Sequence, residues 1–146
     1  MITPGTALEA LRGHLRRKAL EALARHGVPR GRPAIERILA DRAAVRHPLE
    51  IAFGADGLGP GEFAWLEPSG PRPADGFRLH VHPLLAAADE LLPAAVAYYI
   101  PSVNYGAVVG PAEAETYGAA LCAIEPDRYH ATLCEIAHRV DGKATP

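Results

Sequence analysis

An alternating segment that runs directly into an apolar one constrains the fold of this chain most, and it occupies residues 77–106. Phe77, Leu79 and Val81 alternate with polar residues, so a period of two places them on one face of a strand. Pro83 ends that strand, and the run after it is mostly apolar, which is typical of a buried helical segment. We therefore expect a sheet with one buried face and helices that cover it.

Two helices are expected before the strands. Thr6 can cap an amphipathic helix that extends to about His26, with Gly27 as its stop. Pro33 fits the first turn of a second helix. Together they form a basic helical part over residues 1–46.

Strands are expected over residues 49–82. Leu49, Ile51 and Phe53 alternate, and a glycine-dense turn leads into a second strand, which predicts a hairpin. A further loop returns the chain to the strand of Phe77. The three strands together predict an antiparallel meander.

A helical part is expected over residues 84–140. Pro93, Pro111 and Pro126 each fit the first turn of a helix, whereas the segment PSVNYG is expected to be a loop. The predicted fold class is α+β in a single domain, residues 1–146, with two N-terminal helices, a small antiparallel sheet of about three strands, and three or four helices packed on one face. A mostly helical fold with a lone hairpin is the alternative.

The net charge of -2 is unevenly distributed along the 146 residues. Up to Arg46 there are ten Lys or Arg against four Asp or Glu, a net +6, so the remainder carries -8. The two parts can attract each other, within the chain or across a homodimer, or the basic part can bind nucleic acid. No Phe, Trp or Tyr precedes Phe53, so the basic part has no ring on which a base could stack. This favours docking, and nucleic-acid binding is the less favoured interpretation.

The cysteine content and hydropathy indicate a compartment. Cys122 and Cys134 occur without a secretory signal, which favours a reducing environment over a disulfide framework. Acidic residues and a proline interrupt the apolar run between Leu84 and Ile100, so it is not a transmembrane helix. We expect a cytoplasmic protein that does not contact a membrane.

Two histidines in the third expected strand are candidate metal ligands. His80 and His82 share a face and lie roughly 6.5 to 7 Å apart at Cα, close enough for both rings to bind one metal ion. The alternative is that Arg78, His80 and His82 are the solvated face of an edge strand.

A second stripe of candidate ligands, His130, Cys134 and His138, recurs at i, i+4 and i+8 in the last expected helix. The core stripe beside it consists of Tyr129, Leu133, Ile136 and Val140. A mixed His and Cys set favours a transition metal, zinc above others, and a complete site would need further ligands such as His80 and His82. The alternative makes Cys134 a small buried residue and the histidines boundary residues.

The function we predict is a small metal-binding protein, and within that class a metal-dependent hydrolase. Asp89 or Glu90 would serve as the base, and Tyr98, Asn104 and Tyr105 would shape the pocket.

Two other functions use the same residues. One is a Cys134 nucleophile activated by His130 or His138, which the parallel direction of neighbouring side chains on a helix makes less favourable than a metal site. The other is a non-catalytic module, a homodimer, that binds a small-molecule ligand or a protein through the tyrosine-rich segment.

Overall fold

Two helices precede the sheet in the computed structural model, which describes residues 3–141. Their bounds are Pro4–His26 for α1 and Arg32–Ala40 for α2. The side chain of Thr3 accepts a hydrogen bond from the backbone N–H of Thr6, so α1 is capped one turn earlier than the predicted cap. The predicted end is confirmed, because α1 ends at His26 and Gly27 follows with a φ of 77°, a conformation that favours glycine.

Three strands form one mixed sheet. They are β1 (Leu49–Phe53), β2 (Ala64–Pro68) and β3 (Phe77–Val81). The order is β1-β3-β2, with β3 parallel to β1 and antiparallel to β2, so the predicted meander and hairpin are wrong in strand order. Segment 54–63 is longer than a tight hairpin turn, so nothing local holds β1 beside β2. β3 takes the centre instead of an edge, and its Leu79 and Val81 are fully buried.

Short helices follow β3 and two longer ones end the described chain. Their bounds are Leu84–Ala87 for α3, Leu92–Ala97 for α4, Ile100–Tyr105 for α5, Pro111–Cys122 for α6 and Pro126–Val140 for α7, with short 3-10 turns at Pro73–Asp75 (η1) and Gly106–Val108 (η2). The PSVNYG segment is therefore helical, in α5, and not the expected loop. The α+β class, with two N-terminal helices and three strands, is confirmed.

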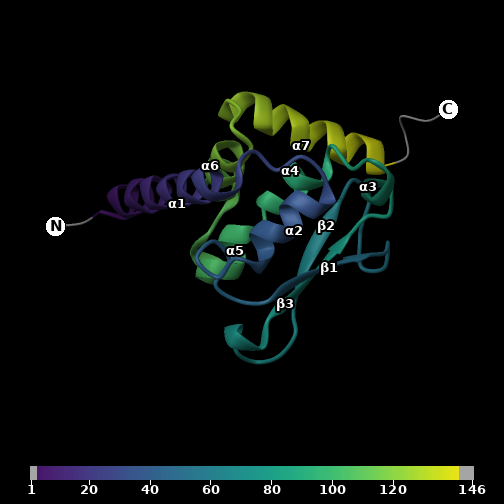
Figure 1. Ribbon diagram of the computed structural model, residues 1–146, viewed down its shortest axis with the longest axis horizontal. Coiled ribbons are helices and arrows are strands. Elements are labelled where there is room, and N and C mark those ends of the chain that lie inside the picture. Colours follow the sequence, from purple (N-terminus) through teal and green to yellow (C-terminus); the bar gives the residue numbers. More distant parts are fainter. Residues whose placement is uncertain (1–2, 142–146) are drawn as a thin grey trace.

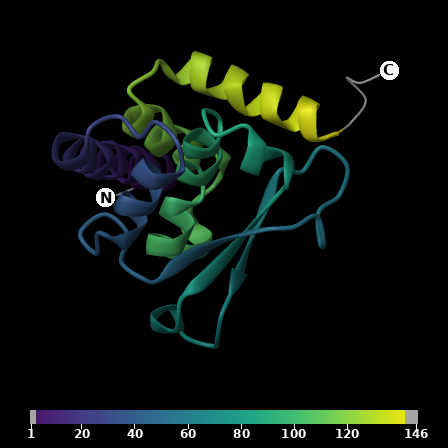
Figure 2. The same ribbon diagram turned by 45° about the vertical axis from the view of Figure 1, so that its right-hand side comes forward.

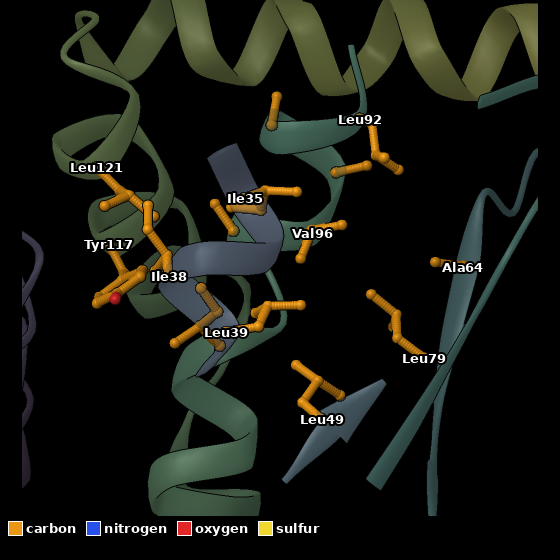
Figure 3. Packing of buried hydrophobic residues seen from close by; sticks show 14 of the residues in the cluster. Ile35, Ile38, Leu39, Leu49, Ala64, Leu79, Leu92, Val96, Tyr117 and Leu121 are labelled. Atoms are coloured by element: carbon orange, nitrogen blue, oxygen red, sulfur yellow. The ribbon is translucent and has the colours of Figure 1, made fainter. Parts of the chain in front are cut away.

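The hydrophobic core lies between one face of the sheet and the helices (Figure 1, Figure 2). Figure 3 shows Leu49 and Leu79 pointing from the sheet toward Ile35 and Leu39 of α2 and Val96 of α4. The alternation predicted for β3 is thereby confirmed. Among the described residues no helix covers the other sheet face, which carries the polar partners of the alternation (Figure 2).

The basic N-terminal part docks on the acidic remainder within the chain. α1 packs along α6, and Arg12 Nε donates to Glu113 Oε2 at 2.9 Å. A second set of contacts lies inside the basic part itself, where Asp41, which follows α2, accepts hydrogen bonds from both Arg25 and His26. Between residues 3 and 141, no helix combines the length and the apolar character that crossing a membrane requires.

Candidate functional site

The two histidines predicted in the third strand each contact other groups of the chain, and His80 lies on the side of the sheet that faces away from the core. His80 stacks on Trp65 with the ring centroids 4.4 Å apart, and its Nε2 lies 2.9 Å from Glu67 Oε1. His82 lies just beyond β3, where its Nδ1 accepts a hydrogen bond from the backbone N–H of Leu84 at 3.1 Å. Each ring therefore already has a protein partner.

A carboxylate predicted as a base instead caps a helix. Asp89 Oδ1 accepts a hydrogen bond from the backbone N–H of Arg32 at 2.9 Å, at the start of α2. Asp89 and Glu90 also border a cavity of about 770 Å³ together with Arg30 and Arg128. None of the predicted metal ligands lines that cavity.

Asn104 and Tyr105 hold α5 against the N-terminal part. Asn104 accepts a hydrogen bond from the Arg46 backbone N–H at 2.8 Å and donates one to the carbonyl of Ala44 at 2.9 Å. The hydroxyl of Tyr105 lies 2.7 Å from His14 Nε2. The structure thus separates these two residues from Tyr98, with which we expected them to form one pocket.

Of the two stripes predicted on α7, the core stripe has the expected burial, whereas the second is more exposed than the predicted border position, and Cys134 is not the buried residue of the alternative. Tyr129, Leu133 and Ile136 are buried and Val140 is partly buried, so the core stripe is confirmed. The second stripe, His130, Cys134 and His138, is exposed.

The expected ligands do not gather into one metal centre. In the part of the chain that the structure describes, no group of three or more His, Cys, Asp or Glu side chains is arranged to hold a metal ion. The five-residue set of His80, His82, His130, Cys134 and His138 is therefore not assembled. Metal binding stays a prediction from the sequence.

Three side chains from α6 and α7 instead form a continuous relay. Glu115 contacts His130 Nδ1 at 2.9 Å through one carboxylate oxygen and at 3.1 Å through the other. On the far side of the ring, His130 Nε2 lies 3.6 Å from the Sγ of Cys134. A carboxylate accepts hydrogen bonds, so Nδ1 carries the hydrogen, and in the neutral ring Nε2 is left free to accept the thiol proton.

The packing of α6 against α7 explains how two neighbours on one helix come to face each other. The hydroxyl of Tyr129 lies so close to Gly118 that a Cβ at this position would have no room. The same hydroxyl donates a hydrogen bond to the carbonyl of Ala94 at 2.7 Å. Glu115 precedes Gly118 by about one turn, and His130 follows Tyr129 directly, so this close approach brings both side chains together. The contact with Glu115 directs the imidazole of His130 so that its other nitrogen faces Cys134.

The relay opens onto a cavity of about 300 Å³ that lies between α7 and the segment leading into β2. Tyr99 fixes one wall, because its hydroxyl donates to the carbonyl of Ala64 at 2.9 Å and its ring meets Phe63 and Tyr98 edge-on. Burial, and then the charge of Glu115, raise the pKa of Tyr98, which keeps its hydroxyl protonated at neutral pH. That hydroxyl makes no hydrogen bond with any residue between 3 and 141, so it is free to donate to a ligand.

The two cysteines differ sharply in their surroundings. Cys134 is exposed at the end of the relay. Cys122 is half-buried and borders the larger cavity, the one beside Asp89 and Glu90. Burial raises the pKa of Cys122 to about 12, so its thiol stays protonated at neutral pH.

Sequence reasoning singled out Tyr98, His130 and Cys134, which line this cavity. It missed Glu115, Glu62 and Phe63, which line the same cavity but come from other elements. No family model, curated protein or solved structure matches this chain.

Proposed function

We propose that the protein is a cysteine-dependent hydrolase that cleaves small esters or thioesters through an acyl intermediate on Cys134. The observation that carries this proposal is the relay from Glu115 through His130 to Cys134, which ends at a cavity. Nucleophilic catalysis requires a base within reach of the nucleophile and a third group that orients the base. The three residues meet both requirements.

The first half of the reaction acylates the enzyme. His130 Nε2 takes the proton of Cys134 as the thiolate forms a bond to the carbonyl carbon of the substrate. When the tetrahedral intermediate collapses, the bond to the leaving alcohol or thiol breaks, and the imidazolium of His130 returns the proton to it. The hydroxyl of Tyr98 is the donor in the cavity that is available to stabilise the developing oxyanion.

The second half regenerates the enzyme. His130 removes a proton from a water molecule, which attacks the acyl carbon, and the carbon–sulfur bond breaks to release a carboxylic acid. Cys134 recovers its proton from His130. Glu115 acts as a positioning residue, because it contacts the imidazole of His130.

The experiment that tests this proposal traps the intermediate. A Cys122→Ser protein, in which Cys134 is the only thiol, is mixed with p-nitrophenyl acetate, and nitrophenol release is followed together with mass spectrometry of the intact protein. We expect a burst of nitrophenol and one acetyl group on Cys134. His130→Ala should slow acylation about a hundredfold.

Two further variants separate the relay from a general effect. Glu115→Gln should lower the rate about tenfold and change its pH profile, since the imidazolium loses its carboxylate partner. His138→Ala, an exposed change on the same helix, should leave the rate unchanged. Acetylation of Cys134 at equal rates with and without His130 would rule out the hydrolase.

A further inference from the structure

The cavity beside Cys134 has ionisable groups of one sign at neutral pH. Among the residues that the structure describes, two carboxylates line it, Glu62 and Glu115, and no Lys or Arg does. His130 is the remaining titratable base on its wall, and the carboxylate of Glu115 already faces that ring. A cavity with such a lining attracts cations and repels anions.

Glu62 is held in place on the segment that leads into β2. One of its oxygens, Oε1, accepts a hydrogen bond from the backbone N–H of Gly59 at 2.5 Å, which leaves Oε2 for a ligand. Glu62 lines the cavity together with Tyr99, whose pKa is raised to about 12 by burial first and then by Tyr98 and Glu62. The opposite side of the cavity lies along α7, where Cys134 is exposed.

Aromatic rings complete the lining. Phe63 and Tyr98 both border the cavity and are only partly buried. The electron-rich face of such a ring attracts an ammonium group, and a neighbouring carboxylate adds to the attraction. A volume of about 300 Å³ lies at the small end of the range for ligand cavities, so the occupant is a small molecule.

We infer that the substrate of this site carries a cationic group, an ammonium or substituted ammonium, which binds between Glu62 and the rings of Phe63 and Tyr98 while its acyl carbon meets Cys134. This inference rests on the proposed function and specifies its substrate class. Anionic acyl compounds of the same size should bind less well, because the two carboxylates repel them.

A pair of reagents that differ in charge tests the inference. Cationic 2-(trimethylammonium)ethyl methanethiosulfonate and anionic 2-sulfonatoethyl methanethiosulfonate react with thiols in the same way. The thiolate attacks the sulfur that bears the ethyl group, a mixed disulfide forms and methanesulfinate leaves. Rates are measured on the Cys122→Ser protein and divided by the rate of each reagent with 2-mercaptoethanol, a thiol that carries no other charged group.

We expect the normalised rate of the cationic reagent to exceed that of the anionic one about tenfold at low salt, and the ratio to fall at high salt. Glu62→Gln retains an oxygen for the Gly59 N–H and should lower the ratio about threefold. Glu9→Gln makes the same charge change on the exposed surface of α1 and should leave it unchanged. A normalised ratio near one that Glu62→Gln does not alter would overturn the inference.

Failure of the inference is distinguishable from failure of the hydrolase. Neutral iodoacetamide reports the nucleophilicity of Cys134 without regard to charge. If His130→Ala slows alkylation by iodoacetamide but the charged reagents react alike, only the substrate class is wrong. If iodoacetamide reacts no faster than with glutathione and His130→Ala has no effect, the relay does not activate Cys134 and both proposals fail.

Discussion

The hydroxyl of Tyr129 lies against the α-carbon of Gly118, at a point where a Cβ would overlap it. Tyr129 is fully buried, and its hydroxyl donates to the carbonyl of Ala94 at 2.7 Å, so the ring cannot move aside without losing that bond. The contact fixes how closely α6 approaches α7. It therefore also fixes the distance between Glu115, which precedes Gly118 by about one turn, and His130, which follows Tyr129 directly.

Replacing this glycine should affect stability and reactivity together. Gly118→Ala is expected to lower the free energy of unfolding by about 1 to 3 kcal/mol, because the added methyl group overpacks the contact with Tyr129. It should also slow alkylation of Cys134, since the displaced helices separate Glu115 from His130. Urea unfolding and iodoacetamide kinetics measure the two effects.

The matched control is Gly13→Ala in α1. A Cβ at Gly13 meets no atom within 4 Å, so the substitution should raise the free energy of unfolding by about 0.5 to 1 kcal/mol through helix propensity alone. Equal effects of the two substitutions would contradict the role given to the contact between Gly118 and Tyr129.

The two thiols should react at very different rates. With substoichiometric iodoacetamide at neutral pH, peptide mapping should find the label on Cys134 and almost none on Cys122, since burial raises the pKa of Cys122 to about 12. Unfolding in urea before labelling should equalise the two sites. Preferential labelling of Cys122 in the folded protein would show that the exposures of the two thiols are misassigned.

The contact between α1 and α6 should depend on one buried carboxylate. Glu113 is 5% exposed, and the hydrogen bond from Arg12 is the main cause that holds its pKa below the ordinary value. Arg12→Ala leaves that carboxylate without its charged partner, and we expect a loss of about 1 to 3 kcal/mol in unfolding free energy. Glu113→Gln keeps a side-chain oxygen for the Gly110 N–H and should cost less.

A double-mutant cycle with Arg12→Ala and Glu113→Gln isolates the pair. The two losses should not add, because each variant removes the same ion pair. Additive losses would mean that the basic segment is held to α6 by apolar packing alone.

Local sequence patterns predicted those elements that a local pattern determines. The core stripe of α7 is confirmed because helical periodicity alone decides which side chains face inward, and Gly27 ends α1 because its conformation favours glycine. The alternation in β3 predicted burial of Leu79 and Val81 for the same reason.

Features that depend on contacts between distant elements were not predictable in this way. Parallel pairing of β1 with β3 joins residues that are 28 positions apart in the sequence, such as Leu49 and Phe77, and no turn motif predicts it. The partner of His130 is Glu115 on the preceding helix, and only the packing of α6 on α7 brings them together. The sequence predicted that His130 and Cys134 would point outward in parallel. In the structure Glu115 holds the imidazole of His130, and Nε2 of that ring faces the Sγ of Cys134.

Acid should remove a contribution that Asp41 makes to stability. A hydrogen bond from His26 is the largest cause that lowers the pKa of Asp41 to about 2, and bonds from the Ala43 N–H and Arg25 contribute as well. The folded pKa lies below the ordinary value of 3.8, so this contribution is complete above about pH 4 and is lost as the pH falls toward 2. Because the carboxylate is partly solvated, we expect this contribution to amount to about 1 kcal/mol.

Asp41→Asn should therefore be less stable than the wild type by about 1 kcal/mol at pH 7, and the two proteins should converge near pH 2. Unfolding free energies measured by urea titration at intervals over this range provide the test, and a difference that stays constant down to pH 2 would show that the charge of Asp41 does not stabilise the fold.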